Sequence, residues 1–283
     1  MAANFWVSSH CQTWLISPSE EAASQKVLDR KSRNATILEL DEIRKLRVHV
    51  AVFISNLGKH QLVRCRQRVI STATAYIARF YHHNSYRDYH PYLMGAVAIY
   101  LASKVEEFAV QPKNIVQAGL DLVKSPYKVN DIVDGEYVLM DELQFNYSEG
   151  SGASLLVFHP YRPMEQYVQD ADMQDILGTA WQMINDSYRI DLVLYHPPHI
   201  LAVAVILMAG SYHNKAMDQW FNGLNFKPEH KGSIKVVQEA LLEMYEEFSH
   251  LDHEEINDIM DKIPPLPPLG DTGSPENYRS SLP

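Results

Sequence analysis

Hydrophobic residues recur along this chain at intervals of three and four positions, the spacing that gathers them on one face of an α-helix. Such stripes run from Val69 to Tyr81, from Ile115 to Leu122 and from Val236 to Phe248. We find no convincing two-residue alternation of the kind that marks a half-buried strand. Prolines also stand where the first turns of helices would begin, which is the helix position that tolerates proline best. These prolines are Pro91, Pro112, Pro163, Pro197 and Pro228. The pattern predicts an all-α protein.

The two most apolar of the predicted helices, residues 93–102 and 200–210, resemble each other. The Tyr-His-Pro sequence that begins at Tyr89 recurs at Tyr195, an offset of 106 residues, and the small apolar residues that follow match at the same offset. A helix end slightly upstream matches at an offset of 107. A period of this length is far longer than the roughly 20–50 residues of a solenoid repeat. We therefore expect a duplicated small helical domain.

The repeat defines the predicted domains. The two copies span residues 36–147 and 155–250, with a flexible linker at 148–154 between them. Residues 1–35 are expected to form an N-terminal helix and a polar connector, and residues 251–283 an acidic and proline-rich tail. The tail contains two overlapping Pro-x-x-Pro matches, for which we favour a solvated tail over a ligand of an aromatic groove.

Composition is typical of a soluble globular protein with a real core, since 46% of the 283 residues are hydrophobic and 21% are charged. The formal net charge of −10 argues against broad binding to a phosphate backbone. The two cysteines, Cys11 and Cys65, cannot form a disulfide framework or a cysteine zinc site, which favours a reducing, intracellular compartment. The longest apolar runs are too short to span a bilayer, so we expect no membrane segment.

Catalytic motifs are weak in this sequence. It has no phosphate-binding Walker loop, no nucleophile elbow and no His-Glu-x-x-His zinc motif. His82, His83 and His90 are a conceivable metal site, but we favour their placement in a polar connection between helices. The sequence therefore predicts no catalytic residue, no metal site and no cofactor.

A basic cluster is formed by Lys59, Arg64, Arg66 and Arg68. It is the best candidate for nucleic-acid binding, but it is short, lies in an acidic chain and contains no interleaved aromatic residues. We favour a solvated helix start, or a patch for an acidic protein partner, over a DNA-binding surface.

Charged residues end the first apolar helix, where the segment 101–107 reads LASKVEE. Lys104 alone has a structural explanation, because a cation near a helix C-terminus is favourable by about 0.3–1 kcal/mol. Glu106 and Glu107 oppose the helix dipole and cancel that benefit. The offset of 106 places three residues without a fixed charge at the corresponding positions of the second copy. These are Gly210, Tyr212 and His213. A charged tip in one copy only indicates a binding site rather than a helix end.

Glu136 lies at the centre of another apolar helix surface, since its neighbours three and four residues away are all apolar. An unpaired buried carboxylate is strongly disfavoured, so Glu136 is either paired or a partly exposed surface acid. Gly135 costs about 1 kcal/mol in a helix relative to alanine, which suggests that another backbone approaches closely there. We expect Lys104 and Glu136 to form one charged feature at an interface.

Five stretches of the chain resemble a known family. They are Asn4-Phe-Trp6, RQRVISTATAYIARFY at 66–81, LASKVEEF at 101–108, FHPYRPMEQYVQD at 158–170 and INDSYRIDLVLYHPP at 184–198. The chain resembles the cyclins, and among them the cyclin C group. The resemblance implies two tandem five-helix cyclin boxes, a short N-terminal helix and a disordered proline-rich C-terminal tail. The first helix lacks the Met-Arg-x-x-Leu patch with which cell-cycle cyclins dock substrates.

The resemblance also implies which residues bind a partner. In cyclins, a lysine of the third helix and a glutamate of the fifth helix of the first box face the regulatory C-helix of a kinase, and these match Lys104 and Glu136. Val105, Met140 and Phe145 match apolar contacts around that pair, and the two glutamates of the tip would attract arginines of the kinase. The full set is Lys104, Val105, Glu106, Glu107, Phe108, Glu136, Met140 and Phe145.

By the same resemblance, the chain is expected to be a nuclear, non-catalytic activator of the Mediator-associated cyclin-dependent kinase. It would meet other subunits of the Mediator kinase module, without direct contact to nucleic acid or a membrane. Three alternatives stay open at this point. They are another transcriptional cyclin of the H, T or K type, a B-type general transcription factor that binds promoter DNA, and a helical enzyme.

Overall fold

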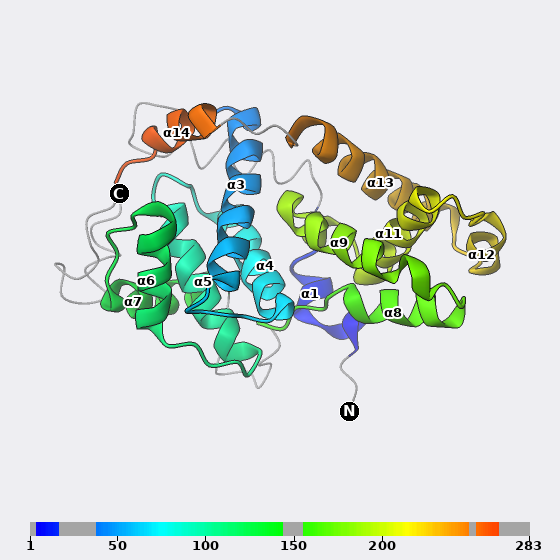
Figure 1. The fold of residues 1–283 in the computed structure, drawn as a ribbon, viewed down its shortest axis with the longest axis horizontal. Coiled ribbons are helices and arrows are strands. Elements are labelled where there is room, and N and C mark those ends of the chain that lie inside the picture. Colours follow the sequence, from blue (N-terminus) through cyan, green and yellow to red (C-terminus); the bar gives the residue numbers. More distant parts are fainter. Residues whose placement is uncertain (1–3, 17–37, 144–154, 249–252, 266–283) are drawn as a thin grey trace. The chain divides into compact units, whose positions relative to one another are not determined.

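The computed structural model describes residues 4–16, 38–143, 155–248 and 253–265 (Figure 1). Every regular element within these ranges is a helix, which confirms the all-α prediction. The chain divides into two compact units, Met1–Val157 with Asp252–Pro283, and Phe158–Leu251. The predicted linker and most of the predicted connector and proline-rich tail lie outside the described residues.

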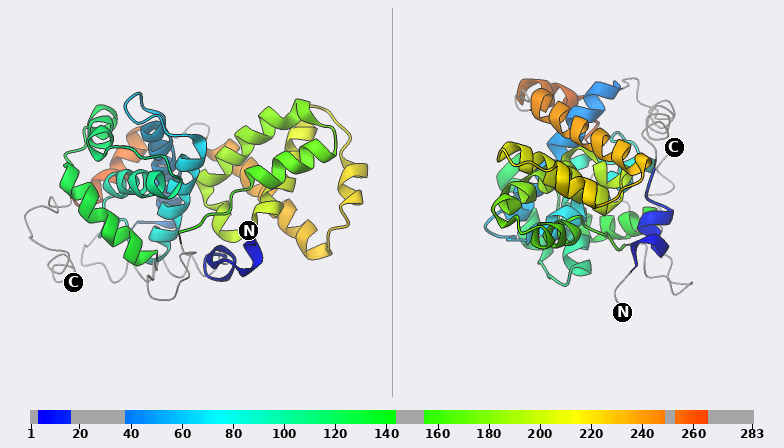
Figure 2. Two further views of the ribbon diagram at one scale, coloured as in Figure 1. Left: turned by 90° about the horizontal axis from the view of Figure 1, so that it is seen from below. Right: turned by 90° about the vertical axis from the view of Figure 1, so that its right-hand side faces the viewer.

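The core of the first unit is built from the described helices α3 to α7, which follow one another along the chain, and Figure 2 shows them from two further directions. Their bounds are α3 Leu40–Lys59, α4 Gln67–His83, α5 Pro91–Val105, α6 Pro112–Val123 and α7 Val129–Glu142. The apolar helix α5 is central and packs against the other four. Val97, Ala98 and Ile99 are fully buried, as expected for a helix that is apolar on nearly every side.

The second unit repeats this arrangement. Its longer helices are α8 Tyr161–Asp170, α9 Leu177–Ser187, α11 Pro198–Tyr212, α12 Asp218–Gly223 and α13 Pro228–Phe248. Shorter elements complete it, namely η3 Gln174–Ile176, η4 Tyr188–Ile190 and α10 Leu192–Tyr195. The apolar helix α11 packs against α8, α9 and α13. Each unit is thus built around one buried helix, as the duplication predicted.

The ends of the two central helices correspond at an offset of 107 residues, so the predicted offset of 106 is wrong there. Phe108 N donates to Ser103 O at 2.7 Å, and Lys215 N donates to Gly210 O at 2.8 Å. Glu107 follows α5 and Asn214, 107 residues later, follows α11, and both adopt the left-handed conformation, with φ of 53° and 56°.

The cause of this shift is a second proline. Pro91 is the first residue of α5, whereas Pro198, and not Pro197, is the first residue of α11. The sequence match had paired Pro91 with Pro197 and so lost one residue. In the corrected register Lys104 corresponds to Ser211, while Glu106 corresponds to His213.

Short segments at both ends of the chain belong to the first unit. η1 Phe5–Val7 and α1 Ser9–Gln12 precede Trp14, whose side chain is 1% exposed. The guanidinium carbon of Arg79 lies 5.3 Å from the centroid of the Trp14 ring, a cation–π contact that joins the N-terminal segment to α4.

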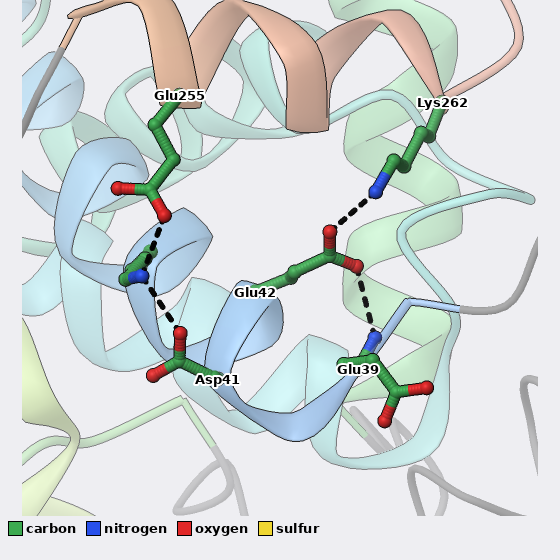
Figure 3. Close-up of polar contacts among 6 residues, drawn as sticks. Glu39, Asp41, Glu42, Glu255 and Lys262 are labelled. Atoms are coloured by element: carbon green, nitrogen blue, oxygen red, sulfur yellow. Dashed lines mark hydrogen bonds and ion pairs between the residues drawn. The ribbon is translucent and has the colours of Figure 1, made fainter.

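Helix α14, His253–Asp261, lies within the range predicted as a tail, yet it packs against α3 (Figures 1 and 3). Its buried face carries isoleucines, and polar contacts flank that face. Lys45 of α3 forms ion pairs with Asp41 at 2.7 Å and Glu255 at 2.6 Å, and Lys262 pairs with Glu42. The buried isoleucines are Ile256 and Ile259 of α14, together with Ile263 just after its end.

Candidate functional site

Lys104 and Glu136 meet where the end of α5 crosses α7. The ammonium nitrogen Nζ of Lys104 donates to Oε1 of Glu136 at 2.8 Å and to Oε2 at 2.7 Å. The Lys104 side chain is 45% exposed, whereas the Glu136 side chain is only 10% exposed. The structure therefore brings together the two residues that the sequence singled out separately, with the lysine facing solvent and the glutamate beneath it.

The surroundings of Lys104 stabilise its charged form. Burial works to lower the pKa of Lys104, but hydrogen bonds with Glu136 and Tyr100 and the charge of Glu136 outweigh it, so that the pKa is raised. Nζ also lies 4.1 Å from the centroid of the Tyr100 ring, within cation–π range. Tyr100 is one helical turn before Lys104, but sequence reasoning gave it no role in the site.

This ion pair contributes little to folding while the lysine stays half exposed, because exposed pairs are worth only about 0–1 kcal/mol. A partner that covers it would remove the water that screens it. Breaking a covered pair of this kind costs roughly 2–5 kcal/mol of binding free energy. The geometry suits recognition better than stabilisation.

Gly135 sets the spacing between α7 and α5. A Cβ atom at this position would lie 2.6 Å from Cγ2 of Val97, far inside ordinary contact distance. The expected close approach therefore exists, but the approaching group is the Val97 side chain and not another backbone. The missing side chain lets α7 come near enough to α5 for the neighbouring Glu136 to reach Lys104.

Glu106 has an internal role that the sequence did not reveal. Its carboxylate accepts a hydrogen bond from the Thr72 hydroxyl at 2.7 Å and pairs with Nε of Arg68 at 2.7 Å. Its side chain is 11% exposed. Glu106 thus ties the end of α5 to α4, which provides the structural explanation that the dipole argument had missed.

The second unit has a tie of the same kind at the corresponding positions. Oγ1 of Thr179 lies 2.8 Å from Nε2 of His213, and Lys215 pairs with Asp175 at 2.6 Å. Ser211 occupies the position of Lys104. The second unit therefore keeps the structural tie but has no lysine at the position that forms the ion pair in the first.

The remaining predicted residues lie around the pair with varied exposure. Glu107 is exposed, and Val105 and Met140 are half-buried. Phe108 is half-buried, and its ring centroid lies 5.8 Å from the guanidinium carbon of Arg66. Tyr137, which sequence reasoning passed over, is 59% exposed beside Glu136. Phe145 lies outside the described residues.

Other candidate sites gain no support. Within the described ranges, no group of three or more histidine, cysteine, aspartate or glutamate residues is placed to hold a metal ion. His82 is buried and its ring centroid lies 4.6 Å from that of the exposed His83. Both lie in the last turn of α4 and not in the connection after it, where the sequence had placed them. The described helices also include none that is both long and apolar enough to cross a membrane.

Comparison with protein families finds a match in the first unit. A family model described as "Cyclin, N-terminal domain" matches residues 21–148, which include α3 to α7 and the Lys104–Glu136 pair.

Full-length relatives show the same similarity over both units. The chain is 34% identical to Cyclin-C1-1 of Oryza sativa subsp. japonica, over 88% of this chain and 91% of the relative. It is 33% identical to Cyclin-C of Rattus norvegicus, over 88% and 86% respectively. It is 34% identical to Cyclin-C of Drosophila melanogaster, over 87% and 90%.

Solved structures share the fold at lower identity. A chain of the CAK complex of Chaetomium thermophilum bound to ATP-gamma-S has a TM-score of 0.67 and 19% identity, over 91% of this chain and 87% of that chain. A chain of the yeast RNA Pol II CTD kinase CTDK-1 complex has a TM-score of 0.65 and 16% identity, over 94% and 81%.

Proposed function

Because this chain belongs to the cyclin family, and within it to the cyclin C group, we propose that it is a non-catalytic regulatory subunit that binds and activates a cyclin-dependent kinase. The observation that carries the proposal is the half-exposed Lys104–Glu136 pair on the first unit. A fixed, solvent-facing ammonium at the end of a buried helix is a feature that a partner can recognise by charge and position.

The kinase surface is formed by the end of α5 and the adjacent face of α7. Lys104 and Glu136 supply its charged centre, while Val105, Met140 and the exposed Tyr137 supply apolar contact area around it. Aromatic side chains of this kind often contribute strongly to binding. Glu107 remains available to attract a cation of the partner, whereas Glu106 is already paired with Arg68.

Activation would work through the position of the kinase's regulatory C-helix. In a protein kinase, a lysine–glutamate ion pair between strand β3 and the C-helix must be complete before the ATP phosphates are held correctly. A subunit that binds the inward position of that helix more tightly than the outward one shifts the kinase population towards the active state. The regulatory subunit supplies no catalytic group.

The likeness to cyclin C proteins further supports a nuclear role with the kinase of the Mediator module, in the regulation of RNA polymerase II transcription. One chain with the same fold comes from an RNA Pol II CTD kinase complex, which agrees with a transcriptional role.

Affinity purification of the tagged chain from its own cells, followed by mass spectrometry, tests this proposal directly. The expected result is co-purification of a cyclin-dependent kinase together with Mediator subunits. Recovery of a kinase without Mediator subunits would contradict the Mediator assignment alone. Recovery without any protein kinase would contradict the proposed function.

A further inference from the structure

Four cations surround the turn between α3 and α4. They are Lys59, Arg64, Arg66 and Arg68, and all four are exposed although the whole chain has a net charge of −10. The backbone brings them to one place, because Cys65 N donates to Gly58 O at 2.7 Å and so sets the end of α3 beside residues 64–66. The cluster is local in space as well as in sequence.

Each of the three arginines is held by one contact within the chain. Nε of Arg64 donates to Gln61 O at 2.8 Å, the Arg66 guanidinium lies over the Phe108 ring, and Nε of Arg68 pairs with Glu106. These contacts restrain the arginine side chains, while Arg64 and Arg66 stay exposed. Donors that are already fixed lose less entropy when a ligand binds.

The cations of this cluster are poorly compensated. Arg68 has the Glu106 carboxylate, but within the described residues Lys59, Arg64 and Arg66 have no ion pair. The carboxylate of Asp121 lies nearby, where it faces His60 at 3.5 Å. The first turn of α4 contains no acid, whereas those of α3 and α7 do. Arg66 and Arg68 at the start of α4 oppose the dipole of that helix, which a bound anion would offset, whereas Lys59 stands in the last turn of α3, where a cation is favourable.

We propose that Lys59, Arg64 and Arg66 form a docking site for a phosphorylated segment of a protein partner. The planar guanidinium group binds phosphate through two parallel hydrogen bonds. A carboxylate can accept the same two hydrogen bonds, but it carries less negative charge than a phosphoryl group. Three cations suit one or two phosphoryl groups. A nucleic acid would need a longer basic stripe to displace its counterions, and this acidic chain has none among the described residues. The site lies next to the proposed kinase surface through the Arg66–Phe108 contact, but it does not depend on kinase binding.

Fluorescence anisotropy with the full chain alone tests the site. The probe is a fluorescein-labelled glycine–serine peptide that carries two phosphoserines, titrated at low ionic strength. The test variant is Arg64→Glu/Arg66→Glu, and the matched control is Lys113→Glu/Lys227→Glu, which reverses two exposed cations of α6 and of the α12–α13 connection. Thermal melting of each variant verifies that it is folded.

The expected result is that the wild type and the control bind the phosphopeptide, that the test variant binds it about tenfold or more weakly, and that the unphosphorylated peptide does not bind. Equal binding by the test variant and the control would overturn the proposal, as would no binding by the folded wild type. Tighter binding of a single-stranded DNA of equal charge, lost in the same variant, would replace the phosphopeptide with a nucleic acid. Because no kinase is present in this experiment, none of these results depends on whether the proposed function is correct.

Discussion

The Lys104 ammonium and the Glu136 carboxylate form a bidentate ion pair, with distances of 2.8 and 2.7 Å, that joins the end of α5 to α7. The two residues have opposite environments, since the lysine is half exposed and the glutamate is nearly covered. The pair therefore presents a positive charge at a fixed point on the surface of the first unit.

The spacing between α5 and α7 is testable at Gly135. Gly135→Ala places a methyl group 2.6 Å from Val97 and should lower the free energy of unfolding by about 1–3 kcal/mol, with a parallel loss of kinase binding. The double variant Gly135→Ala/Val97→Ala removes the clash and should recover most of the wild-type kinase affinity. Urea unfolding and a kinase pull-down provide the two measurements. If Gly135→Ala alone leaves both unchanged, the close approach does not set the site.

Glu106 should stabilise the fold more than its ion-pair partner does. Glu106→Ala removes an almost covered carboxylate and leaves the Thr72 hydroxyl without that acceptor, so the free energy of unfolding should fall by about 1–3 kcal/mol. Arg68→Ala is the control, because the 63% exposed arginine should contribute no more than about 1 kcal/mol. Urea denaturation compares the two. If Glu106→Ala were as stable as the wild type, the contacts of Glu106 between α4 and α5 would not contribute to the stability of the fold.

The attachment of α14 should weaken in acid. Burial works to raise the pKa of Glu42, but its hydrogen bonds with Lys262 and the Glu39 amide, and the charge of Lys262, lower the pKa below its ordinary value of 4.5. A carboxyl group whose pKa is lowered by folding stabilises the folded state above that ordinary value, and this contribution is lost as the pH falls below it.

The variant Glu42→Gln isolates this effect. As the pH falls from about 6 to about 3, the wild type should lose more of the hydrogen-exchange protection of α14 than Glu42→Gln does, with most of the difference below pH 4.5. Equal losses in the two proteins would assign the acid sensitivity to other carboxylates.

The second unit provides an internal control for the site. Ser211→Lys introduces an ammonium at the position that corresponds to Lys104, on an exposed side chain, and should leave kinase affinity unchanged. The offset of 106 had paired Lys104 with Gly210. A substitution at Gly210 is unsuitable as this control, because a Cβ there would lie 2.5 Å from Met217 and disturb the packing. A loss of kinase affinity in Ser211→Lys comparable to that in a Lys104 variant would mean that the first unit is not the principal kinase surface.

The sequence was sufficient to predict the helices and the duplication, because buried helices impose a strict apolar spacing and first-turn prolines mark their starts. It was also sufficient to pair Lys104 with Glu136, since each interrupts an apolar surface. It was not sufficient for the register at the helix ends, where the second proline at Pro198 shifts the match by one residue.

Long-range partners were beyond sequence reasoning. Glu106 is compensated by Arg68 and Thr72, which lie more than thirty residues earlier in the chain, so the acid had seemed uncompensated. α14 is too short to be predicted from its own spacing, and its packing on α3 depends on contacts more than two hundred residues apart. In each case the stabilising contact joins residues far apart in the chain, so the spacing of neighbouring residues does not predict it.

Exchanging the two charges of the central pair tests the account most directly. Lys104→Glu and Glu136→Lys should each weaken binding of the co-purifying kinase by about thirtyfold or more, as expected for a covered charge pair. The double variant Lys104→Glu/Glu136→Lys can re-form the pair within the chain, but it presents a carboxylate to the kinase in place of the ammonium. Thermal melting should find the double variant folded, and surface plasmon resonance should find its kinase binding still weak. Restoration of wild-type affinity by the exchange would show that the pair only holds α5 to α7 and would contradict its role in recognition.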